Sequence, residues 1–427
     1  GDKMIKPIKF SQDIVNDMLR RTAREAASVD DAVRDIINNV MSDGDAALFE
    51  YSRKFDGVTL SSFKVSEEEF AEAERLVGED YRAILKRSAD NIAAFHRCQL
   101  RKGFEIEEDG CVIGQKVIPL ESAGLYVPGG TAAYPSTVLM NAIPAKIAEV
   151  GRIVMVTPPL KNGKVKPEVL VAAQVAGIDE VYKIGGAQAI AALAYGTESI
   201  PKVDKITGPG NIYVATAKKM VFGVCGIDMV AGPSEILVIA DDGAEAKNVA
   251  ADLLSQAEHD MRATAVLITD SQKLAEEVSY ELERQVRLLP RYEIANKSLE
   301  DNCKLIVTDN LEEAVRLSDK LAPEHLELCV KEPEKLLGIV RNAGSVFMGY
   351  NTPEAVGDYY AGTNHTLPTG GTARFSSPLG VEDFIKTTQY VKYTSQKLEK
   401  SADDIIKFAQ SEGLTAHAES VAVRFKK

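Results

Sequence analysis

The sequence predicts an α/β protein with two doubly wound, incomplete Rossmann-like parallel sheets, and three observations lead to this prediction. Short apolar segments alternate with segments of helical composition, which is typical of parallel βαβ units. The alternation runs through two successive series, 152–242 and 244–349. Glycine-rich turns stand where strands lead into helices, as in "IGGAQ" (184–188) and "TGPGN" (207–211). We therefore expect each series to form its own sheet.

The first series begins with an apolar strand, "RIVMVTPP" (152–159). After it we expect helix 166–177, strand 179–186, helix 187–196, strand 203–210, helix 211–223 and strand 235–242. The second series is expected to contain helix 244–258, strand 263–269, helix 271–287, strand 304–308, helix 311–321 and strand 325–330. A last strand follows in "GSVFMG" (344–349).

Small helical domains are expected before and after the two series. The first helix begins near Ser28, and Ser66 with Glu69 forms a capping box for another. The segment "CVIGQKVIPL" (111–120) has the β-branched composition of a strand. The tail from 397 to 427 is amphipathic, which predicts helices that cover another surface.

Composition excludes several classes of function. The net charge of −13 argues against binding to nucleic acid or to an anionic membrane. No apolar run is long enough for a membrane span, and the N-terminal residues lack the apolar core of a signal peptide. Five scattered cysteines, none in a C-x-x-C pair, indicate a reducing compartment. We therefore expect a cytoplasmic protein without macromolecular partners.

Standard motifs leave the function open. The sequence contains no G-x-G-x-x-G, no P-loop and no H-E-x-x-H, and "GPSEI" (232–236) falls short of a nucleophile elbow. The two glycine-rich turns can hold a phosphate with their backbone N–H groups. Tight turn geometry alone explains them more simply, and both interpretations stay open.

The histidines indicate where a site could form. His96 lies within a helix and is expected to be structural, whereas His259 and His325 lie where helices lead into strands. Glu324 and His325 suit general acid/base chemistry. Alternatively, His325 stabilises the dipole at a helix C-terminus and Glu324 is solvated. Gln256 and His259 share a helix face at spacing i, i+3, so they are either half of a metal site or exposed to water.

The chain resembles the histidinol dehydrogenase family over almost its whole length. The matching segments are "GLYVPGG" (124–130), "GGAQAIAALAYGT" (185–197), "DKITGPGNIYVATAK" (204–218), "AGPSEILVIAD" (231–241), "DLLSQAEHD" (252–260), "LAPEHLEL" (321–328), "GDYYAGTNHTLPT" (357–369) and "EGLTAHAES" (412–420). The resemblance implies oxidation of L-histidinol to L-histidine through an aldehyde, with two NAD+ and one zinc ion per subunit of a homodimer. This is the last step of histidine biosynthesis.

The resemblance also implies roles for individual residues. Zinc ligands would be Gln256, His259, Asp358 and His417, and the acid/base pair would be Glu324 and His325. These six residues, with Ser234 and Glu412, would surround the substrate, and Tyr126, Gln188 and Asn211 would contact NAD+. The implied domains are an arm at 1–21, a larger α/β domain from 22–125 and 233–378, a second at 126–232, and a C-terminal domain at 379–427 that completes the partner's site.

The implied ligands suit zinc, because this borderline-soft ion favours nitrogen and Asp358 would be the only anionic ligand. The metal would then mainly hold the substrate. His365 is expected to shape its loop by hydrogen bonding. Two alternatives remain: a related enzyme that oxidises another small alcohol with NAD and zinc, and a metal-binding scaffold without turnover.

Overall fold

A computed structural model describes residues 5–11, 13, 18, 29–129 and 133–426. The helix start near Ser28 and most of the arm predicted at 1–21 lie outside these residues. The chain divides into two compact units, which are described separately. The larger unit consists of Gly1–Gln99 and Leu120–Phe384, and the smaller of Leu100–Pro119 and Ile385–Lys427. The finer domain boundaries expected from the resemblance stay a prediction.

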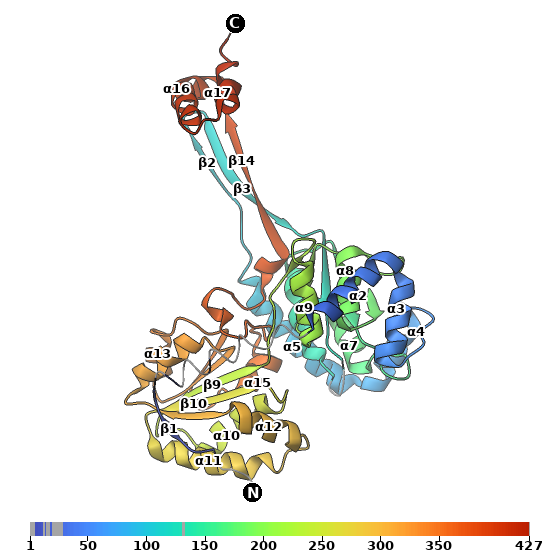
Figure 1. The fold of residues 1–427 in the computed structure, drawn as a ribbon, viewed down its shortest axis with the longest axis vertical. Coiled ribbons are helices and arrows are strands. Elements are labelled where there is room, and N and C mark those ends of the chain that lie inside the picture. The colour runs from blue at the N-terminus through green and yellow to red at the C-terminus, as the bar shows by residue number, and fades with distance from the viewer. Residues whose placement is uncertain (1–4, 12, 14–17, 19–28, 130–132, 427) are drawn as a thin grey trace. The chain divides into compact units, whose positions relative to one another are not determined.

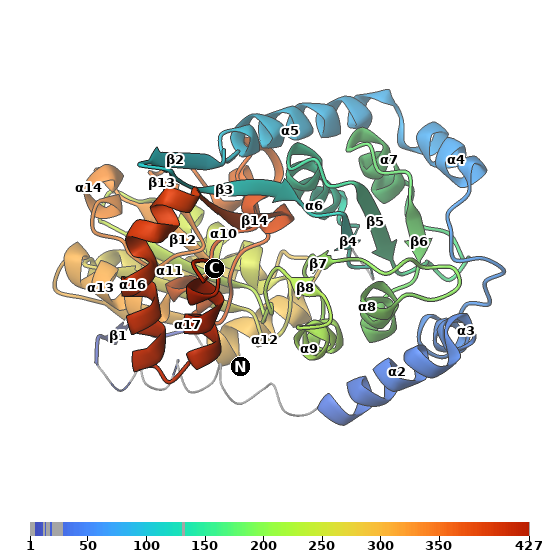
Figure 2. The same ribbon diagram turned by 90° about the horizontal axis from the view of Figure 1, so that it is seen from above.

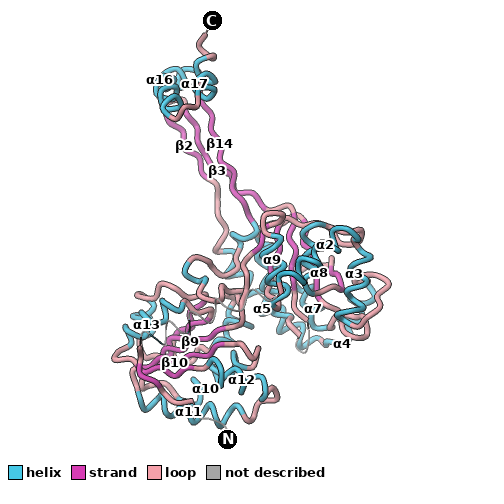
Figure 3. The backbone as a smooth tube through the Cα atoms, in the orientation of Figure 1, coloured by secondary structure: helices cyan, strands magenta, loops and turns pink. Residues whose placement is uncertain are grey.

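The larger unit contains two parallel sheets, as the sequence predicts (Figures 1 and 3). The expectation that each series forms its own sheet is wrong for one strand, because 235–240, the last strand of the first series, lies between two strands of the second series. Within the described residues, one sheet has the strand order β1-β11-β10-β9-β12-β13, with every neighbouring pair parallel. Its strands are β1 (Ile8–Lys9), β9 (Glu235–Ala240), β10 (Thr264–Thr269), β11 (Lys304–Val307), β12 (His325–Cys329) and β13 (Ser345–Met348). We call it the β9 sheet.

Helices cover both faces of the β9 sheet because its strands are apolar on both sides. Ile236 and Val238 pack against α10 (Ala246–Ala257), α11 (Gln272–Val286) and α12 (Tyr292–Asn302). Leu237 and Ile239 point to the other face, toward α13 (Leu311–Leu321) and α14 (Pro333–Leu337). Period-two alternation thus supplies two cores from one strand.

The second parallel sheet, the β4 sheet, has the order β6-β5-β4-β7-β8 in the described chain. Its strands are β4 (Ser122–Tyr126), β5 (Arg152–Thr157), β6 (Val181–Lys183), β7 (Lys205–Thr207) and β8 (Gly226–Ile227). The strand β4, which comes first in the sequence, lies in the middle of the sheet. The chain adds β5 and β6 on one side of it and then β7 and β8 on the other. This arrangement places a topological switch point between β4 and β7, where α/β proteins commonly bind ligands.

Helices also pack on the β4 sheet. On one face lie α2 (Asp30–Asp43), α3 (Asp45–Tyr51), α8 (Gly186–Tyr195) and α9 (Ile212–Val221). Elsewhere α6 (Pro135–Ile147) contacts β4, and α7 (Pro167–Val175) packs on α6. Outside them lie α4 (Glu67–Val77) and α5 (Glu79–Arg97), as Figure 2 shows. Short elements η1 (Ser52–Asp56), α15 (Glu354–Val356), η2 (Gly357–Ala361), η3 (Thr372–Arg374) and η4 (Val381–Phe384) complete the unit.

The smaller unit contains an antiparallel sheet and two helices. The strands are β2 (Phe104–Glu108), β3 (Cys111–Pro119) and β14 (Ile385–Tyr393), with β3 in the middle. The helices α16 (Ser395–Ser411) and α17 (Thr415–Ala422) confirm the helical tail. The strand β14 is an addition that the sequence pattern did not predict, because its residues are mostly exposed and form no apolar run.

Candidate active site

A cavity of about 2060 Å³ lies between the two parallel sheets of the larger unit. The β4 sheet contributes the carboxyl ends of its strands, including Tyr126 and Thr157. The β9 sheet contributes amino ends instead, since Glu235, Thr264 and His325 each begin a strand. The rule that α/β sites lie at carboxyl ends therefore holds here for only one sheet. Helix ends of the second series meet strand starts at this edge, as the histidine positions suggested.

The C-terminal end of α10 delivers the glutamine and histidine singled out in the sequence. Gln256 is fully buried in the last turn, and the backbone N–H of His259 donates to the carbonyl of Gln256 at 3.1 Å. Both residues line the cavity. Gln256 Nε2 lies 3.1 Å from Nδ1 of His325, and among the described residues nothing bonds to Gln256 Oε1. Gln256 thus faces the cavity from a buried position, whereas His259 lines it with an exposed side chain.

Glu324 and His325 are buried together where β12 begins. One carboxylate oxygen of Glu324 accepts from the backbone N–H of Glu235 at 2.9 Å and lies 3.7 Å from Nδ1 of His325. The same ring nitrogen lies 3.0 Å from the carbonyl oxygen of Glu235. The sheet register explains this contact, because His325 pairs with Ile236 of β9. The alternative of a solvated helix end is therefore wrong for this pair.

Two further carboxylates approach the other nitrogen of His325. Its Nε2 lies 3.8 Å from Oε1 of Glu354 and 3.7 Å from Oδ1 of Asp358. One ligand atom from each of His325, Glu354 and Asp358 falls within 4.8 Å of the others, close enough to share a cation. Neither Nε2 of His325 nor Oε2 of Glu354 has a hydrogen-bond partner among the described residues.

Sequence reasoning missed Glu354. Glu354 lies on α15 and Asp358 four residues later on η2, which continues α15 directly. The two carboxylates therefore share one helical face. That spacing was the signal that could have found it.

Burial dominates the electrostatics of these groups. It raises the pKa of Glu324 to about 8 and that of Glu354 to about 7. Burial lowers the pKa of His325, but the charges of Glu354 and Glu324 outweigh this effect and hold the pKa well above its ordinary value. Burial also acts to raise the pKa of Asp358, yet the nearby positive charge of His325 leaves the pKa lowered. The site is thus a cluster of buried acids around one imidazole.

Glu235 is a second acid that sequence reasoning missed, although it belongs to the quoted "GPSEI". Burial raises its pKa to about 7, and Oε1 accepts from the backbone N–H of Gly370 at 3.2 Å. Its neighbour Ser234 is half-buried on the cavity wall. The carbonyl oxygen of Ser234 accepts from the backbone N–H of Thr264, which links the starts of β9 and β10.

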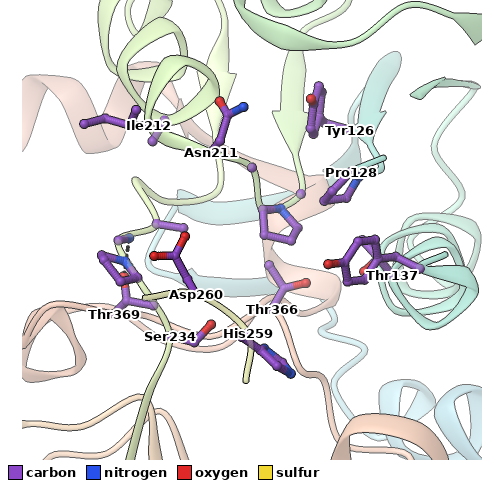
Figure 4. Close-up of a pocket in the computed structure, with 18 of the residues that line it drawn as sticks. Tyr126, Pro128, Thr137, Asn211, Ile212, Ser234, His259, Asp260, Thr366 and Thr369 are labelled. Carbon is purple, nitrogen blue, oxygen red and sulfur yellow. Dashed lines mark hydrogen bonds between the residues drawn. The ribbon is translucent and has the colours of Figure 1, made fainter. Parts of the chain in front are cut away.

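The residues expected to contact NAD+ line the cavity on the side of the β4 sheet. Figure 4 shows Tyr126 and Asn211 on one side and Ser234 and His259 on the other. The hydroxyl of Tyr126 accepts from the backbone N–H of Gly186 at 3.1 Å. Gln188 is buried in the first turn of α8. The side-chain oxygen of Asn211 caps α9 by accepting from the N–H groups of Tyr213 and Val214.

The remaining candidates divide between the two units. His365 is half-buried and lines the cavity, and burial lowers its pKa. Glu412 and His417 belong to the smaller unit, at the end of α16 and on α17, with exposed side chains. His96 is buried against Gln99, at 2.7 Å, and Asn364, at 3.3 Å, which confirms its structural role.

Helix length and polarity give one further result. Within the described ranges, no helix combines the length and the apolar character that crossing a membrane requires.

The chain is similar to known proteins over most of its length. The sequence profile of the histidinol dehydrogenase family matches residues 19–425. Histidinol dehydrogenase from Bacillus cereus is 52% identical over 423 residues, which cover 99% of this chain and 96% of that protein. The one from Geobacillus kaustophilus is 55% identical, with 93% and 94% covered. The crystal structure of histidinol dehydrogenase from Elizabethkingia anophelis superposes with a TM-score of 0.93 at 38% identity, covering 99% of this chain and 98% of that one.

Proposed function

Because the chain belongs to the histidinol dehydrogenase family of NAD-dependent oxidoreductases, we propose that it oxidises L-histidinol to L-histidine through L-histidinaldehyde. Two NAD+ are consumed per substrate, because alcohol to acid is a four-electron oxidation. One observation carries the proposal. A buried acid/base pair, a set of nitrogen and oxygen ligands and two glycine-rich turns line the same cavity.

We infer that zinc belongs to this site, held by Gln256, His259 and Asp358 with His417 of a second copy. The fit is supported by donors of the type that zinc favours and by Oε1 of Gln256, which lacks a partner among the described residues. When bound, zinc would act as a Lewis acid that fixes the imidazole and amine of the substrate.

Metal content tests this ligand set against the cluster of His325, Glu354 and Asp358. The variant His259→Ala should lose zinc, whereas Glu354→Gln should retain it. The measurement is zinc per chain after dialysis. Loss of zinc from Glu354→Gln with retention in His259→Ala would reverse the assignment.

The protein's own residues supply both proton transfers. In its neutral form, His325 accepts the proton of the alcohol while the carbon gives up a hydride to NAD+. Glu324 then takes a proton from water that attacks the aldehyde, and the hydrate gives up the second hydride. The raised pKa of Glu324, about 8, lies near neutrality, where a general base and its conjugate acid are both accessible. Ser234 and Glu412 are proposed to orient the substrate, and Tyr126, Gln188 and Asn211 the dinucleotide.

The proposal is tested by counting NADH. Wild-type protein should form two NADH per L-histidinol, and Glu324→Gln should stop near one, because the alcohol step needs His325 but the water step needs Glu324. The matched control is Glu334→Gln, an exposed glutamate on α14. Two NADH at the wild-type rate from Glu324→Gln would remove Glu324 from its role. No NADH from wild-type protein would contradict the activity itself.

The proposal extends to assembly and location. We propose a homodimer in which Glu412 and His417 of each copy complete the other's site. A cytoplasmic location is proposed from the scattered, unpaired cysteines, of which Cys225, Cys303 and Cys329 are buried.

A further inference from the structure

A buried ion pair lies behind the turn at 207–211. Lys218 on α9 pairs with Asp228, which directly follows β8, and their side chains are only 2% and 0% exposed. Nζ of Lys218 also donates to the carbonyl oxygen of Gly208 at 2.8 Å. Burial of a lysine this complete is rare unless the charge is paired and hydrogen-bonded, as it is here.

The pair holds both polar groups of Gly208. While Lys218 binds the carbonyl, Oδ2 of Asp228 accepts from the N–H of Gly208 at 2.8 Å. Oδ1 of Asp228 accepts from the N–H of Met229 at 2.6 Å, which fixes the carboxylate itself. The two charged side chains therefore hold the backbone at the start of the turn through both of its polar groups.

Gly208 is also pressed against the end of β4. Its φ of +113° suits glycine, and a Cβ at this position would lie 2.1 Å from the carbonyl oxygen of Tyr126. The hydroxyl of Tyr126 holds the N–H of Gly186 at the other glycine-rich turn. The ion pair and Tyr126 together thus fix the positions of the two turns relative to one another at the switch point of the sheet.

The turn presents its outer side to the cavity, where Gly208, Pro209, Gly210 and Asn211 all form part of the wall. Because the oxygen of Asn211 caps α9, its amide group points its Nδ2 donor away from the helix. A ligand at this wall would meet a donor whose position depends on the turn.

A buried ion pair seldom adds net stability, because desolvation of both charges offsets their attraction. We propose that Lys218 and Asp228 are positioning residues for the pyridine dinucleotide, acting through the turn at 207–211. This inference rests on the proposed function, since it takes NAD+ to be the ligand of that wall. Neither residue needs to touch the dinucleotide.

The test is the double variant Lys218→Met/Asp228→Asn, which removes both charges and so leaves no unpaired charge buried. Dissociation of NADH is measured by its own fluorescence, in a chain without tryptophan. We expect the Kd to rise about tenfold, as loss of one charge-assisted hydrogen bond produces. The KM for L-histidinol and the melting temperature should stay near wild type. The control is Lys219→Met, the exposed neighbour on the same helix.

An unchanged Kd for NADH overturns the inference. So does a parallel rise of the NADH Kd and the L-histidinol KM with a lower melting temperature, because that pattern marks general loosening. If the double variant does not fold, the isosteric Asp228→Asn carries the same measurements, and its failure to fold also counts against a separable positioning role. Wild-type protein that binds NADH but does not oxidise L-histidinol contradicts the proposed function and not this inference.

Discussion

At the scale of single residues, this protein is distinguished by carboxyl groups whose pKa values burial raises to near neutrality. Behind the site, Asp252 on α10 and Glu327 on β12 form a second such pair. Burial raises the pKa of Asp252 to about 6, and burial together with the charge of Asp252 raises that of Glu327. Oε1 of Glu327 accepts from the backbone N–H of Glu354 at 2.8 Å, so the pair supports α15.

This pair should make stability depend on pH. Both folded pKa values lie above those of free carboxyls, so its contribution is complete below about pH 4 and is lost as pH rises through about 6. Between about pH 5 and about pH 8 the free energy of unfolding should fall less in Asp252→Asn than in the wild type. The difference should be on the order of 1 to 2 kcal/mol. Urea unfolding across that range measures it. The exposed Asp242→Asn is the control, and equal slopes in both variants would contradict the prediction.

The candidate residues divide by what sequence can indicate. Positions where helices lead into strands singled out Gln256, His259, Glu324 and His325 as candidates, but their roles came only from the resemblance. Glu354 could have been found from its spacing to Asp358. Glu235 and Glu327 could not, because their significance comes from burial by elements distant in sequence, and a glutamate in a strand carries no local pattern that indicates it.

At the scale of elements, local hydrogen bonding specifies helix α4. The capping box predicted from Ser66 and Glu69 is confirmed, with bonds of 3.3 Å and 3.0 Å in the two directions. Glu69 also pairs with Lys183 of β6 at 3.0 Å. One glutamate thus starts the helix and ties it to the β4 sheet.

Ser66→Ala should lower the free energy of unfolding by about 1 kcal/mol, because the N–H of Glu69 loses its acceptor. Chemical denaturation gives the value, and hydrogen exchange should show faster opening confined to α4. Ser61→Ala, an exposed serine five residues earlier, is the control. Equal effects from both substitutions would refute a capping role.

Most of the α/β architecture was predictable at this scale. Each predicted strand of the two series is present, because strands buried on both faces are continuous apolar runs. The strand β14 escaped because "IKTTQYVKY" is mostly exposed and its partner β3 lies far back along the chain. Pairing between distant segments leaves no local pattern to detect.

At the scale of the whole molecule, the proposal assigns part of each site to a second copy. Mixing inactive His259→Ala with inactive His417→Ala protein should restore partial activity, because a heterodimer would contain one site with neither substitution. NADH formation at several mixing ratios measures this. A mixture of His259→Ala with a second preparation of itself is the control. No recovery at any ratio would argue for sites built within one chain.

The antiparallel sheet of the smaller unit has a consequence for biosynthesis. The strand β14 pairs with β3 from Tyr393 opposite Cys111 to Ile385 opposite Pro119. The hairpin of β2 and β3 therefore leaves the ribosome well before β14, which follows only after residues 120–384 of the larger unit. Throughout that interval one edge of β3 has no strand beside it, and an unpaired edge invites association with other chains. Nascent protein therefore cannot complete its smaller unit until residues 120–384 have been synthesised, and a chain that stalls before residue 385 would expose that edge to chaperones and proteases.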